Sequence, residues 1–141
     1  MTKDLVYGFI DSQRLAVFTT ISPEGKPQSA LVGIAVTPRF EIVFDTLRST
    51  RKFRNLLQNS DASLVIGCTG EITAQYEGEA RELSGHELKH YQDVYFAKWP
   101  DGPSRLNWPG LTYIAVKPHW IRYSDFSAHP PLIEELAFPS K

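Results

Sequence analysis

Basic residues cluster where a strand pattern gives way to a helix pattern, in the segment FDTLRSTRK at residues 44–52. Ser49 or Thr50 is a suitable N-cap for a helix predicted over residues 50–59. A helix N-terminus carries about +0.5 charge, so cations there are unfavourable unless an anion binds. Backbone N–H groups, hydroxyls and basic side chains would then converge on that anion. This reasoning predicts a phosphate site, the alternative being a solvated basic face, and four side chains crowd the position: Arg48, Arg51, Lys52 and Arg54.

A second motif, His86-Glu-Leu-Lys-His90, matches the H-E-x-x-H signature of zinc peptidases. At about 100° per residue, however, both histidines lie opposite the apolar face of their helix. We therefore expect them to point into solvent rather than to line a cleft. No G-x-x-H continuation follows His90, so a third zinc ligand would have to come from His119, His129 or a glutamate. A zinc peptidase stays a remote alternative.

Composition limits the partners of the chain. The 141 residues carry 15 Lys and Arg against 16 Asp and Glu, a formal net charge of −1. No global basic field exists to hold nucleic acid or an anionic membrane, so neither partner is expected and an anion site must be local. The single cysteine, Cys68, excludes an internal disulfide, is typical of a reducing compartment, and is expected in the core. Without a signal-peptide pattern or an apolar run of about 20 residues, the expected location is cytoplasmic.

The length of the chain predicts a single domain over residues 1–141. The hydrophobic periodicity predicts that strands dominate in it. The first three strands form a meander without crossover helices, which argues against a doubly wound α/β fold and favours a small, mostly antiparallel barrel. The amphipathic tail at residues 128–141 is too short to fold alone and is expected to dock on the rest. The predicted strands are 14–21, 28–37, 41–46, 62–69, 72–83 and 111–127, the last one bent or split in two, and the predicted helices are 4–13, 50–59 and 84–99.

The basic segment resembles the FMN-phosphate motif F-Y-T-N-x-x-S-R-K of the pyridoxamine 5′-phosphate oxidase family, the FMN-binding split barrels. Phe44, Thr46, Arg51 and Lys52 match it without a gap, and Thr50 stands for the serine. Upstream, the turn Gly25-Lys-Pro27 and the strand after it are similar to the family's G-x-P turn and flavin strand. Downstream, the run Glu77-Gly78-Glu79-Ala80 resembles its V-x-G-x-A/V pattern.

This resemblance implies a mainly β fold, a six-stranded antiparallel split β-barrel with short peripheral helices. It also implies a homodimer that binds FMN between its two subunits, with Trp108 in a W-x-G-like motif reaching the flavin of the partner. The cofactor-binding residues that the resemblance implies are Ala30, Leu31, Val32, Asp45, Thr46, Thr50, Arg51, Lys52, Thr73, Gln75 and Trp108.

The sequence departs from the oxidase proper at several of these positions. Ala30 replaces an arginine on the flavin strand, and Thr73 replaces a glutamine, with Gln75 two residues on. Asp45 replaces a tyrosine and needs Arg48 or Arg51 to neutralise it beside a phosphate. Pyridoxamine phosphate oxidation is therefore not favoured. The expected function is an FMN-dependent oxidoreductase that moves hydride or electrons between a small molecule, or a nicotinamide donor, and the flavin. The alternative is a non-enzymatic flavin-, deazaflavin- or haem-binding, or stress-related, protein.

Overall fold

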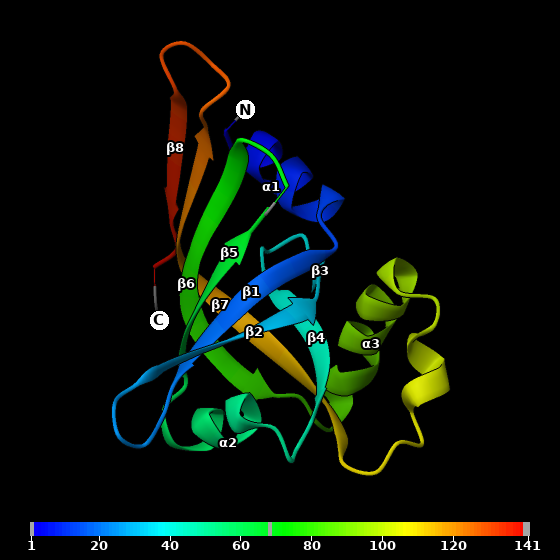
Figure 1. Ribbon diagram of the computed structural model, residues 1–141. Coiled ribbons are helices and arrows are strands. Elements are labelled where there is room, and N and C mark those ends of the chain that lie inside the picture. The colour runs from blue at the N-terminus through cyan, green and yellow to red at the C-terminus, as the bar shows by residue number, and fades with distance from the viewer. Residues whose placement is uncertain (1, 68, 140–141) are drawn as a thin grey trace.

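A single curled antiparallel sheet organises the chain in the computed structural model, which describes residues 2–67 and 69–139 (Figure 1). In this view α1 and α2 lie at opposite ends of the sheet and α3 lies beside it. The strands are β1 (Leu15–Ile21), β2 (Pro27–Gly33), β3 (Ala35–Val36), β4 (Ile42–Leu47), β5 (Asp61–Ile66), β6 (Ile72–Glu82), β7 (Leu111–Asp125) and β8 (Leu132–Ala137). The helices are α1 (Thr2–Ser12), α2 (Arg51–Gln58), α3 (His86–Lys98) and the short 3₁₀ turn η1 (Gly102–Arg105).

The strand order is β2-β1-β5-β6-β7-β4-β3, so β2 and β3 stand at opposite ends of the sheet although only Ile34 separates them in sequence. Because a single residue joins these two end strands, they must lie close together in space, and the sheet has to curl. Trp99, just after α3, fixes the crossing: its Nε1–H donates to the Ile34 carbonyl at 2.9 Å. Gly33 leaves room for this indole, because a Cβ there would lie 2.6 Å from the ring.

The inner face of the curled sheet holds the apolar core. Phe18 of β1 and Phe44 of β4 are fully buried and meet edge to face, with their ring centroids 4.8 Å apart. Tyr76 of β6 is also buried in this core. Its hydroxyl donates to the carbonyl oxygens of Phe40 at 2.7 Å and Val116 at 2.9 Å. A buried phenol with satisfied hydrogen bonds stabilises one strand arrangement over others.

The predicted fold class is confirmed: the protein is mainly β, with an antiparallel split barrel and short peripheral helices. Two details differ from the six expected strands. The strand predicted over residues 28–37 breaks at Ile34, where the chain changes sheet ends. The tail forms β8, because β4 pairs only with residues 111–116 of β7 and leaves residues 120–125 with an open edge for it to cover. The expectation for Cys68 lies outside the described residues.

No helix in the described ranges has both the length and the apolar composition that a membrane span requires.

Gly78 provides a test of this architecture, because it lies at the register shift between β6 and β7. A Cβ at this position would meet the Lys117 carbonyl oxygen at 2.1 Å, so backbone would have to move. We expect Gly78→Ala to lower the free energy of unfolding by about 2–4 kcal/mol in urea denaturation. The control is Gly8→Ala in α1, where nothing lies within 4 Å, and it should be neutral or stabilising by up to about 1 kcal/mol. Equal effects of the two changes would contradict the close approach.

Candidate functional site

A groove of about 240 Å³ lies between β2 and the first turn of α2, and we call it the β2–α2 groove. It forms because β2 ends the sheet on its side while α2 packs against β1 and β2. Four of the residues that the sequence predicted for the cofactor meet here. The lining residues are Thr20, Gln28, Ser29, Ala30, Thr50, Arg51 and Lys52.

The N-terminus of α2 is capped by Thr50, one of the two predicted caps. Its hydroxyl oxygen accepts the Phe53 N–H at 3.4 Å, and the hydroxyl donates to the Leu47 carbonyl at 2.8 Å. The buried Thr46 hydroxyl lies 3.3 Å from the same oxygen. The first-turn N–H groups before Phe53 face out of the helix end, as they do at any helix N-terminus. A capped end of this kind presents donors to an anion.

Arg51 and Lys52 supply the positive charge of the groove. Neither has a carboxylate within 4.0 Å among the described residues, and the first turn of α2 contains no acidic residue. Burial lowers the pKa of the Lys52 ammonium below its ordinary value. An anion in the groove would offset this desolvation. Arg48, which the sequence grouped with them, instead forms an ion pair with Glu82 at 2.7 Å.

Asn55 holds α2 against β1 and β2 and was not singled out by the sequence. It is buried on the inner side of α2, where its Nδ2 group donates to Thr20 Oγ1 of β1 and to Gln28 Oε1 of β2, both at 2.9 Å. Both amide hydrogens are therefore used to hold the helix against the hairpin. The sequence signal that could have identified Asn55 is a polar residue in the middle of a short helix, one turn after the pair Arg51 and Lys52.

Asp45 does not line the groove. Adjacent residues of a strand face opposite sides, so Asp45 turns away from Thr46 and toward α3. Its carboxylate accepts Arg105 Nε–H at 2.9 Å and the Tyr95 hydroxyl at 3.1 Å. The expectation that Arg48 or Arg51 neutralises Asp45 is wrong, because the ion-pair partner of Asp45 is Arg105, the last residue of η1. Burial, followed by the charge of Asp45, raises the pKa of Tyr95, so this phenol keeps its proton.

The remaining predicted residues also lie outside the groove in one copy of the chain. Val32 is buried in the core, whereas Leu31 is 61% exposed on the outer face of β2. Thr73 and Gln75 are on the outer face of β6, three strands away from β2. Trp108, 51% exposed, is in the loop after η1. Their contact with a cofactor stays a prediction.

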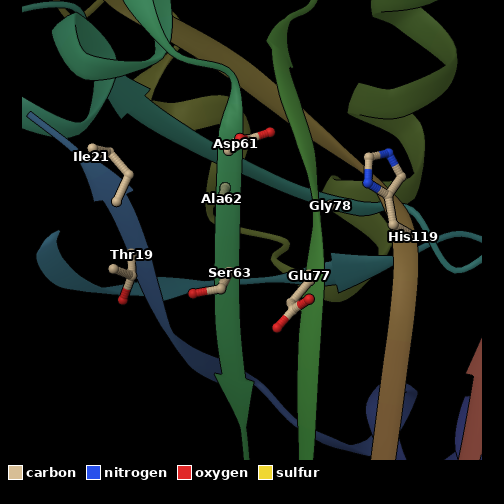
Figure 2. A pocket seen from close by; sticks show the side chains of 8 residues that line it. All are labelled: Thr19, Ile21, Asp61, Ala62, Ser63, Glu77, Gly78 and His119. Atoms are coloured by element: carbon tan, nitrogen blue, oxygen red, sulfur yellow. The ribbon is translucent and has the colours of Figure 1, made fainter. Parts of the chain in front are cut away.

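The outer face of β1, β5, β6 and β7 carries a shallow pocket of about 370 Å³ (Figure 2). The hydroxyls of Thr19 and Ser63 and the carboxylates of Asp61 and Glu77 line it, with His119 on its other side. Two carboxylates make this surface unfavourable for a phosphate. The β2–α2 groove is therefore the better anion site.

The H-E-x-x-H motif forms the first turn and a half of α3. His86 and His90 are exposed while Tyr91 and Tyr95 are buried, so the predicted helical phase is confirmed. In residues 2–67 and 69–139, no three side chains of metal-ligating type gather at one place.

Comparison with known proteins identifies the family of the chain. The sequence model described as pyridoxamine 5′-phosphate oxidase matches residues 2–125. The chain belongs to the pyridoxamine 5′-phosphate oxidase family. A search among curated proteins finds no match.

Solved structures of the same fold have low sequence identity to this family member. A haem-binding protein from Mycobacterium smegmatis gives a TM-score of 0.84 at 13% identity, covering 97% of this chain and 58% of its own. General Stress Protein 26 from Bacillus anthracis gives 0.72 at 24% identity, covering 95% and 98%. A pyridoxamine 5′-phosphate oxidase-related, FMN-binding protein from Nostoc punctiforme gives 0.65 at 13% identity, covering 99% and 91%. The chain thus spans just over half the length of the Mycobacterium protein.

The exposed histidines of α3 allow a direct test of the peptidase alternative. We expect the double variant His86→Ala/His90→Ala to change the free energy of unfolding by no more than about 0.5 kcal/mol, because both side chains face water. Zinc content measured by mass spectrometry should be substoichiometric in both proteins. Stoichiometric zinc that disappears in the variant, together with a peptidase activity, would reverse the ranking of the two motifs.

Proposed function

We propose that this family member binds FMN, with the 5′-phosphate at the N-terminus of α2, and acts as an FMN-dependent oxidoreductase. The observation that carries the proposal is the pair Arg51 and Lys52, which have no carboxylate partner among the described residues and lie at a capped helix N-terminus. Charge-assisted hydrogen bonds from such groups are the strong ones that phosphate sites use.

The other residues of the groove fit the rest of the cofactor. β2 pairs with β1 on one side, and within the described chain no strand covers its other edge. An open edge offers N–H and C=O groups to the polar rim of a flavin ring. Ala30 has a small side chain and leaves room beside that edge. Bound FMN would supply the redox chemistry, while the chain orients the ring and neutralises the phosphate.

We infer a homodimer from the apolar stripe on the outer face. Leu31, Val17 and Val65 are register neighbours across β2, β1 and β5, and Leu31 and Val65 are 61% and 44% exposed. Gln75 continues the same row on β6. A second copy that covers this stripe would bury the apolar side chains and bring Gln75 and Thr73 of each subunit toward the groove of the other. The homodimer is thus what would unite the predicted residues.

The substrate class in this proposal is a small molecule, with a nicotinamide as electron donor. A second candidate is a non-enzymatic binding protein, favoured by the names of two structural neighbours, the haem-binding protein and the general stress protein. The absorbance spectrum of the purified protein separates the two cofactors. Flavin bands, with FMN released on heating, support the first candidate, and a Soret band supports haem. Steady oxidation of a reduced nicotinamide with an acceptor then separates an enzyme from a carrier.

Substitution of the basic pair tests the phosphate site. We expect Arg51→Ala and Lys52→Ala each to weaken FMN binding about ten- to hundredfold, because each removes a charge-assisted contact. Calorimetric titration of FMN-free protein measures this loss. Arg54→Ala is the matched control, since Arg54 is exposed on the same helix and does not line the groove, and it should change affinity by less than about threefold. Wild-type affinity in both groove variants would rule out the phosphate assignment.

Assembly gives an independent test. If the flavin lies between two subunits, FMN and the dimer stabilise each other by linkage. Sedimentation velocity at several concentrations should therefore show monomers at higher concentration without FMN than with it. Leu31→Lys should weaken the dimer, whereas Leu57→Lys, on an equally exposed leucine of α2, should not. A flavin-loaded protein that sediments as a monomer throughout would contradict both the stripe and the shared site.

A further inference from the structure

A pocket of about 550 Å³ lies apart from the β2–α2 groove and shares no lining residue with it. Its walls come from the β3–β4 turn, the end of β6, the beginning of α3, the middle of β7 and the segment after β8. Its volume is in the range of small-molecule sites in proteins, about 300–1,000 Å³. Neither the phosphate motif nor the proposed flavin chemistry uses any of these residues.

A buried carboxylate lines this pocket. Glu41 is 9% exposed, and its Oε1 accepts the Tyr91 hydroxyl at 2.9 Å and the Thr37 hydroxyl at 3.4 Å. Burial raises the pKa of Tyr91, so the phenol retains the proton that it donates. Among the described residues, Oε2 of Glu41 accepts no hydrogen bond. This oxygen is not itself buried, so it is free to accept a hydrogen bond from a ligand in the pocket.

Three basic side chains line the same pocket. Arg39 and Lys117 are exposed and have no carboxylate within 4.0 Å in the described part of the chain. Arg81, a third cation of the pocket, is held in place by Glu87 at 2.8 Å and by the Tyr91 hydroxyl at 3.3 Å. Three cations against the carboxylates of Glu41 and Glu87 leave a local excess of one positive charge. The pocket as a whole therefore favours an anion.

An apolar wall completes the lining of the pocket. Phe138 lines the pocket together with Pro118 and Pro139. The position of Phe138 is fixed by its ring contact with Phe40, at 5.4 Å between centroids, and by its N–H, which donates to the His119 carbonyl at 2.9 Å. A flat apolar body would pack against this wall.

We propose that this pocket binds a small aromatic anion that also carries an amino group. The anionic group meets Arg39 and Lys117, the ring packs on Phe138, and the amino N–H donates to Oε2 of Glu41. The inference does not depend on FMN binding, because it uses other residues.

The probes are 4-aminobenzoate, with both groups, and benzoate, which lacks the amine. Chemical-shift titration of the 15N-labelled full chain should move amides around Glu41, Tyr91 and Phe138. 4-Aminobenzoate should bind at least about fivefold more tightly than benzoate. Shifts confined to other regions, or equal affinity for the two probes, would overturn the proposal.

Variants assign the two contacts. Arg39→Ala/Lys117→Ala should weaken both probes about tenfold, whereas Lys26→Ala, an exposed lysine in the β1–β2 turn, should not. Glu41→Gln should abolish the preference for the amine and leave benzoate binding intact. The 15N chemical-shift spectrum of Glu41→Gln shows whether that variant folds. If it does not fold, the Arg39→Ala/Lys117→Ala variant tests the proposal instead, because both side chains are exposed and their removal should leave the fold unchanged. Wild-type affinity in that variant would overturn the proposal.

Arg51→Ala/Lys52→Ala separates this pocket from the flavin proposal. We expect that variant to bind 4-aminobenzoate like the wild type. A tenfold loss there would place the probe in the β2–α2 groove and overturn the second site, whatever the outcome for FMN.

Discussion

The covalent continuity of residues 27–36 constrains the rest of the structure. One short segment supplies both ends of the sheet, β2 and β3, and the crossing at Gly33 and Ile34 is held by the Trp99 indole. In the described part of the chain no strand pairs with the remaining edge of β2, and α2 packs across the β1–β2 hairpin. Asn55 holds α2 to both β1 and β2 through one amide group. The β2–α2 groove therefore forms because β2 ends the sheet and α2 packs beside it, and these two elements position the residues that line it.

Charge pairing decides which basic residues remain available for a ligand. Arg48 is paired with Glu82 and Arg105 with Asp45, whereas Arg51 and Lys52 have no carboxylate partner in the described chain. Burial lowers the pKa of Lys52, so its charged form is disfavoured in the folded protein. The resulting loss of stability is present at neutral pH and diminishes as the pH rises through the lowered pKa. A bound phosphate would favour the charged form of Lys52 and so offset this loss, as expected of a residue placed for binding rather than for stability.

Local features could be predicted from the sequence, whereas long-range partners could not. The cap at Thr50, the solvent-facing phase of His86 and the strands themselves follow from short-range pattern. The neutralisation of Asp45 comes from Arg105, 60 residues away, and the break at Ile34 depends on Trp99, 65 residues away. The pairing of β8 likewise depends on β7 being longer than the strand beside it. The spacing of residues within one element does not contain that information. The sequence could therefore predict the helix N-terminus that forms the candidate groove, but not which distant residues pair with its neighbours.

The family match covers the whole β2–α2 groove and most of the second pocket. The family model covers residues 2–125, which include every residue of the β2–α2 groove. The apolar wall of the other pocket includes Phe138 and Pro139, which lie beyond that match and are carried by the strand that pairs with β7. A common scaffold with sites added at its periphery is how one fold supports different functions. Seven of the nine residues that line this pocket lie inside the family match, so the pocket is built mainly on the barrel, and only its apolar wall depends on the segment after β8.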